Sequence, residues 1–166
     1  MAFKSVSLKN SVVKFLDGTT PTAKSVTVNI GDGNISWSES RELEYLKDRG
    51  TLDAVEESEE NPISVDLGFR WTDFRSDPSG TVTPYDAVTG TGATITDSWT
   101  TSDTLDPCGP LAIDIEITFT PTCVAEPTEV YTLKAFRYED ISPDMGAKQL
   151  SVTGSCNTRH VSIARI

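Results

Sequence analysis

Two segments of this chain alternate apolar and polar residues with almost no interruption. The longer one covers residues 111–120 and places Asp114 and Glu116 on its polar side. Residues 63–72 repeat the pattern, with Asp66 among the polar positions. A period of two is typical of a β-strand with one buried and one solvated face, and such strands occur mostly in antiparallel sheets. The chain is therefore predicted to be mainly β, as an antiparallel β-sandwich or barrel.

Shorter segments complete the set of expected strands. They show the same alternation and are bounded by Gly, Pro, Asp and Asn, which favour turns. These segments are residues 12–16, 25–30, 34–38, 129–138, 148–155 and 160–166. A length of 166 residues is usual for one folding unit, so a single domain over residues 1–166 is expected.

Helix signals are sparse. Thr83 can cap a helix that begins at Pro84 and ends before Gly90, because Pro is favoured at the first helical position and Gly after the last. This predicts one short helix on the flank of the sheet. It lies in residues 72–110, a stretch rich in Ser, Thr, Gly, Asp and Pro that is expected to form a long surface connection.

Residues 38–50 fit two structures equally well. Leu43 and Leu46 are three residues apart, between a capping Ser and a terminal Gly, which favours a helix. Leu43 and Tyr45 also alternate with glutamates, and Asp48-Arg49-Gly50 can form the turn of a hairpin. The residues alone leave both interpretations open.

Charge is distributed unevenly along the chain. Its 25 acidic and 14 basic residues give a formal net charge of −11, yet residues 1–30 sum to +3 and residues 134–166 to +2. The remaining middle is strongly acidic, most densely at residues 53–60. Such a composition excludes ordinary binding to DNA phosphates. The acidic run indicates either a solvated loop or a surface for a basic partner, including a second copy of the chain.

The sequence contains no membrane or export signal that we can identify. No apolar run approaches the ~18 residues of a membrane-spanning helix. The first 15 residues mix lysines with apolar residues, unlike the unbroken apolar stretch of a signal peptide. We expect a protein that is made in a cytoplasm and has no membrane partner.

Motifs for catalysis or cofactor binding are also missing from the sequence. His160 is the only histidine, and no nucleophile elbow, phosphate-binding loop or metal-binding helix motif occurs. Asp114 and Glu116 are about 7 Å apart on one strand face, a spacing that alternate carboxylates on a wet face also show. We expect no enzyme, no catalytic residue and no cofactor.

The three cysteines allow several structures. Together with His160, the thiols of Cys108, Cys123 and Cys156 have the composition of a Cys3His metal site, but the close Cys-x2-Cys pairing of such sites is absent. Cys108 and Cys123 each lie in a Pro-containing turn at an end of the 111–120 strand. Small buried thiols that close the strand ends are favoured, with a disulfide or a metal as the alternatives.

A resemblance emerges from several turn-and-strand motifs taken together. The stretch Gly31-Asp-Gly-Asn-Ile-Ser-Trp-Ser-Glu-Ser-Arg41 continues through Glu44-Tyr45, Asp48-Arg49-Gly50, Leu52-Asp53 and Glu59-Glu60-Asn61-Pro62. The likeness extends through Ile63–Trp71, Asp106-Pro107-Cys108-Gly109-Pro110 and Gly154-Ser155-Cys156-Asn157. Over most of its length, the chain resembles tail tube proteins of long-tailed bacteriophages.

The resemblance implies a β-sandwich or barrel with a small flanking helix, in which six copies join their sheets into a ring. Rings would stack into a hollow tube that transmits genome DNA, and the partners would be further copies and other tail proteins. The protein would be part of the virion tail, assembled in the bacterial cytoplasm. An extended hairpin over residues 39–61 would reach the neighbouring ring.

Site residues follow from this resemblance. The stacking hairpin would present Asp48, Arg49, Gly50, Leu52, Val55, Glu59 and Glu60 to the next ring. A bore lined by acidic groups repels DNA and so lets it pass, and the candidates are the polar-face residues Asp66, Asp114 and Glu116. The alternative for these three is a solvated outer face. Residues 79–104 have no counterpart in the resemblance.

Two other functions fit the same pattern. One is a tail terminator or another protein of a tube-like injection apparatus. The other is a carbohydrate- or surface-binding β-sandwich, motivated by Trp37, Trp71 and Trp99, of which Trp99 lies outside the strand patterns and is the candidate for an exposed platform.

Overall fold

The computed structural model describes residues 7–71, 82–122 and 126–166. A short 3-10 helix, η1 (Leu8–Asn10), precedes the first strand. The strands are β1 (Ser11–Leu16), β2 (Ser25–Val28), β3 (Ile35–Ser38), β4 (Arg41–Asp48), β5 (Thr51–Glu60), β6 (Ile63–Arg70), β7 (Ile113–Phe119), β8 (Glu129–Asp144), β9 (Gln149–Cys156) and β10 (Ser162–Arg165). Two short helices, α1 (Pro84–Thr89) and α2 (Ala93–Ser98), lie between β6 and β7. The prediction of a mainly β chain with an extended hairpin is confirmed.

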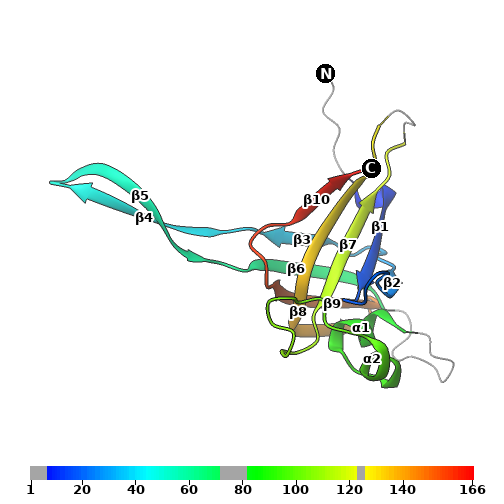
Figure 1. Ribbon diagram of the computed structural model, residues 1–166. Coiled ribbons are helices and arrows are strands. Elements are labelled where there is room, and N and C mark those ends of the chain that lie inside the picture. Colours follow the sequence, from blue (N-terminus) through cyan, green and yellow to red (C-terminus); the bar gives the residue numbers. More distant parts are fainter. Residues whose placement is uncertain (1–6, 72–81, 123–125) are drawn as a thin grey trace.

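The main sheet is antiparallel and open. Its strand order is β2-β1-β7-β8-β9-β6-β3, with β10 added beside β8. The sheet folds over itself, so that β6 and β3 cross the layer formed by β1, β7 and the first half of β8 (Figure 1). Because β2 and β3 end the order without pairing to each other, the described strands form a sandwich and not the closed barrel that the sequence also allowed.

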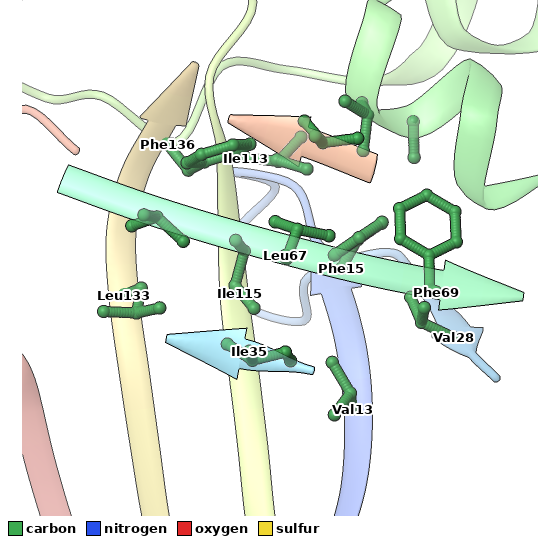
Figure 2. Packing of buried hydrophobic residues seen from close by; sticks show 14 of the residues in the cluster. Val13, Phe15, Val28, Ile35, Leu67, Phe69, Ile113, Ile115, Leu133 and Phe136 are labelled. Atoms are coloured by element: carbon green, nitrogen blue, oxygen red, sulfur yellow. The ribbon is translucent and has the colours of Figure 1, made fainter. Parts of the chain in front are cut away.

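The core lies between these two layers, as Figure 2 shows for β6 crossing β1, β7 and β8. Every second residue of β6, and of β7 from Ile113 to Ile117, is buried, in agreement with the alternation in the sequence. Phe15 of β1 and Phe69 of β6 meet edge to face across the layers, with ring centroids 5.8 Å apart. Each such fully buried side chain stabilises the fold by about 1.5–3 kcal/mol, and β6 and β7 together supply seven of the 22 buried apolar residues among those described.

Strand β8 connects the two layers through a sharp local distortion. Its first half pairs with β7 and its second half with β9. At the junction Ala135 has φ = 56°, and its backbone N–H donates to the Asp114 carboxylate at 2.9 Å. The Ala135 carbonyl accepts from the backbone N–H of Asn157. These bonds satisfy the backbone groups that the bulge removes from the ladder.

Helix α1 forms as the sequence predicts. The Thr83 hydroxyl accepts from the Asp86 backbone N–H, Pro84 occupies the first turn, and Gly90 ends the helix with φ = 67°. In Figure 1, α1 and α2 lie together at one end of the sandwich, away from β10.

Helix α2 was not predicted from the sequence. Its residues include β-branched Thr94, Ile95 and Thr96, which are weak helix formers, and Gly92 before it offers no side-chain cap. Ile95 is buried, as is Trp99 directly after the helix. Tertiary burial therefore stabilises a helix that local propensity does not favour.

A buried carboxylate joins the connection before β7 to the middle of β8 and to the residue that follows β9. The Asp103 side chain, only 1% exposed, accepts from Arg137 at 2.6 Å, from the Asn157 amide at 2.9 Å and from two backbone N–H groups, those of Leu105 and Asp106. Burial opposes ionisation, yet these donors together hold the pKa of Asp103 at about 2, below its ordinary 3.8.

We expect Asp103→Asn to lower the free energy of unfolding by about 2–3 kcal/mol, because Arg137 and the backbone donors lose their charged acceptor. The pKa is lowered by folding, so the contribution of the carboxylate is complete above pH 4 and is lost as pH falls towards 2. Urea titrations between pH 2 and 7 should therefore show a steeper acid loss for the native chain than for the variant. Asp106→Asn, at an exposed position, is the matched control; equal slopes for native chain and Asp103→Asn would contradict this role.

Candidate assembly surfaces

Strands β4 and β5 form a two-stranded ribbon, here called the arm (residues 41–60), that projects from the sandwich (Figure 1). With eight and ten residues, it is roughly 30 Å long. Arg49 and Gly50 connect the strands with φ values of 50° and 86°, the left-handed pair that a two-residue type I′ turn requires. The hairpin interpretation of residues 38–50 is confirmed, and the helix interpretation is wrong.

The register of the arm separates two faces. Tyr45 pairs with Val55, Leu43 with Glu57 and Lys47 with Leu52, so these side chains lie on one face. Tyr45, Leu52 and Val55 are 56%, 66% and 54% exposed. We call Leu43, Tyr45, Leu52 and Val55 the apolar face of the arm. Large apolar side chains gathered on an exposed ribbon mark a site of protein–protein contact.

The opposite face of the arm is acidic. Glu44 pairs with Glu56, while Leu46, Ala54 and the Asp48–Thr51 pair complete this side. Over residues 41–60, eight acidic and three basic side chains give a net charge of −5. Of the predicted stacking residues, only Leu52 and Val55 belong to the apolar face.

The root of the arm is attached to the segment before β10. Glu39 accepts from the backbone N–H of Val161 at 2.8 Å and lies 3.1 Å from the His160 ring nitrogen. The Val161 bond, and after it His160, lowers the pKa of Glu39. Arg159 contacts Glu57 and lies 3.5 Å from Glu60. Glu60 therefore has an intramolecular partner at the root, although the sequence suggested it for contact with the next ring.

An apolar hollow of about 320 Å³ opens where β3 faces β7 and β8. Its apolar lining is Leu8, Ile35, Trp37, Ile117 and Tyr131. The Trp37 and Tyr131 rings lie 6.2 Å apart in a tilted arrangement, and both side chains are partly exposed. We call this site the Trp37–Tyr131 hollow.

The three candidates for a bore lining do not lie on one surface. By the alternation of buried residues, Asp66 lies on the outer side of β6, whereas Asp114 and Glu116 lie on the outer side of β7, in the other layer. Asp114 is partly buried and bonded to Ala135; burial raises its pKa, against the opposing effect of that bond. One layer at most can face a bore, and Asp114 supports the β8 bulge.

The expectation that Cys108 and Cys123 are small buried groups at the ends of the 111–120 strand is wrong for Cys108. Cys108 is exposed, because its turn lies outside the layers, whereas Cys156 is completely buried; both are free. Cys123 lies outside the described residues. Burial, with a further contribution from nearby Asp114, raises the pKa of Cys156 to about 12. In the described part of the chain, no three His, Cys, Asp or Glu side chains gather as metal ligands.

We expect a thiol reagent at pH 8 to modify native Cys108 quickly and Cys156 only after unfolding, because the Cys156 thiolate is inaccessible and scarcely populated. A Cys123→Ser background removes the third thiol, and Cys108→Ser then identifies the fast phase. Fast modification of Cys156 in the folded protein would contradict its burial.

The hypothesis that Trp99 is an exposed platform for glycans is wrong. It is 8% exposed and packs in the core beside α2, so it cannot present a flat ring to a ligand. Among the helices that the structure describes, none is long and apolar enough to cross a membrane.

Comparison with known proteins gives a structural likeness. No family model matches the sequence. No curated protein matches it either. Among solved structures, a sheath/tube terminator of an extracellular contractile injection system, in the extended state, is similar with a TM-score of 0.60, 11% identity, and coverage of 99% of both chains.

Two further structures are similar at lower scores. One is the tube-terminating cap of the anti-feeding prophage (TM-score 0.49, 12% identity, 100% of this chain and 95% of that chain). The other comes from the baseplate of that particle (TM-score 0.42, 14% identity, 99% and 97%). The first of these likenesses shows that this fold also occurs in a terminator of an extracellular contractile injection system. The resemblance to tail tube proteins has no matching sequence family.

The resemblance favoured the hairpin, but the sequence did not predict the two different faces of the arm. The two faces follow from the pairing register, which two irregularities shift, between Arg41 and Leu43 and between Leu46 and Lys47. The turn at Arg49-Gly50 was a usable signal, because it fixes the pairing near the tip. The Trp37–Tyr131 hollow joins residues from four distant segments and has no local signature.

Proposed function

We propose that this protein is a structural subunit that ends the tube of a phage-tail-like apparatus, where copies assemble into a ring through their arms. The observation that supports it most directly is the exposed apolar face of the arm, on a fold shared with an injection-system terminator. The ring number of six and the place in a virion tail come from the resemblance to tail tube proteins.

The arm favours contact between copies for an energetic reason. Three of its large apolar side chains are more than half exposed, and burial of the exposed part of each would contribute about 1–2 kcal/mol. Two strands alone cannot bury such a face, and an isolated hairpin is marginally stable in water. A neighbouring copy supplies the missing cover without any other partner.

The sheet edges support the same proposal. β2 and β3 end the strand order, and β10 pairs with β8 alone among the described strands. Exposed edges invite pairing with another chain, and a subunit of an assembly can use them for that purpose. Contacts between different surfaces of identical copies close into a ring or continue as a filament, depending on the rotation between copies.

A tube subunit is the second candidate, and the acidic character of the chain favours it. An acidic bore would let DNA pass without binding, and Glu116 and its neighbours on β7, or Asp66 on β6, would supply one wall. A terminator forms one closed ring, whereas a tube subunit adds ring upon ring.

We expect the purified protein to form particles of one discrete size as its concentration rises, seen as rings in negative-stain images and as a single mass in mass photometry. Filaments that lengthen with concentration would favour the tube subunit over the terminator. A strict monomer at every concentration would contradict both.

The arm is tested by replacing residues 44–56 with Asn-Gly, which joins Leu43 to Glu57 through a two-residue turn and keeps the root contacts of Arg159. We expect a monomer whose free energy of unfolding changes by less than about 0.5 kcal/mol, because the removed residues are exposed. Melting by circular dichroism controls for the fold. Rings of normal size from this variant would show that the arm has no part in assembly.

A further inference from the structure

The arm needs a matching surface on its partner, and the same chain has an exposed one. The Trp37–Tyr131 hollow is apolar, partly aromatic and open to solvent. Ile163, the register partner of Tyr131 on β10, is 58% exposed and extends the apolar surface beyond the hollow. The floor of the hollow is the edge of the core at Ile35 and Ile117, while Trp37, Tyr131 and Ile163 remain partly or largely exposed among the described residues.

A chain cannot use its own arm for this purpose. The arm leaves the body beyond β3 and extends away from the sandwich (Figure 1). Glu39 and Glu57, bonded to the segment before β10, hold its root in that direction. The apolar face near the tip is therefore available only to another molecule.

Size and chemistry agree between the two surfaces. A hollow of about 320 Å³ is near the lower limit of ligand pockets, suited to one or two side chains. Tyr45 and Val55 lie side by side on the arm as register partners. An inserted Tyr45 ring would join the Trp37–Tyr131 pair, and aromatic side chains favour such edge or offset contacts.

Charge favours the same pairing. The arm has a net charge of −5. Lys9 lines an adjacent cavity that shares Leu8 and Ser11 with the hollow; it is exposed and has no ion pair with the described residues. The other charged groups nearby, Glu129 and Arg165, are paired with each other at 2.9 Å. An approaching acidic arm therefore meets a free positive charge.

We propose that the apolar face of one copy's arm binds in the Trp37–Tyr131 hollow of a second copy, with Tyr45 and Val55 as the inserted residues. This inference rests on the proposed function and specifies the partner surface of the arm. The contact is between different surfaces, so each copy gives one arm and receives one.

The test uses two single variants and their mixture. Tyr45→Asp disables the arm and leaves the hollow intact, whereas Leu8→Asp places a charge in the hollow and leaves the arm intact. We expect each variant alone to associate at least ten-fold more weakly than the native protein, as for a central interface residue. A mixture of the two should form heterodimers of twice the 18.0 kDa monomer mass and nothing larger, because only one complete contact can form.

Two control variants separate loss of the proposed contact from a general effect of adding a charge. Leu46→Asp changes the other face of the arm, and Met145→Asp changes a remote exposed residue; both should assemble normally. Ile163→Asp, at the exposed rim, repeats the hollow test if Leu8→Asp does not fold. If Leu8→Asp and Ile163→Asp assemble like the native protein while Tyr45→Asp does not, the hollow is not the receptor, although arm-dependent assembly stands. If the native protein never associates, both proposals fail.

Discussion

A ribbon of two strands has no interior, so the arm cannot bury its own apolar side chains. Its residues alternate between two faces, and each face meets only solvent unless another body covers it. Every residue of β5 is exposed, including Leu52 and Val55. The apolar face therefore has no cover within the described part of the chain, and we propose that a second copy covers it.

The sandwich provides the rigid base that an extended arm requires. Its core joins two layers through contacts such as Phe15–Phe69, and the bulge at Ala135 lets β8 belong to both layers. Buried Asp103 fixes the connection before β7 to Arg137 and Asn157. The contacts of Arg159 with Glu57 and of Val161 with Glu39 attach the root of the arm to the segment before β10. They therefore restrict the directions in which the arm can project from the sandwich.

Local patterns predicted those parts of the fold that depend on local rules. Alternation located β6 and β7, and capping residues located α1, because in both cases neighbours in sequence determine the structure. α2 was missed because burial of Ile95 and Trp99 outweighs its weak propensity. The exposure of Cys108, the division of Asp66 and Asp114 between opposite layers, and the Trp37–Tyr131 hollow all depend on how distant strands cross. The turn at Asp48-Arg49-Gly50 allowed a hairpin and the resemblance to tail tube proteins favoured it, but its apolar face depends on a register with two irregularities.

The most direct test of whether the arms hold the copies together is amide hydrogen exchange of residues 41–60. The exchange rates are compared between the monomeric and the assembled protein. We expect the amides of the arm to exchange fast in the monomer at low concentration. In the assembly, the amides from Tyr45 to Val55 should be strongly protected. Exchange in buried β7 should be the same in both states, since its core does not change. An arm that exchanges equally fast in the assembled particle would contradict the account.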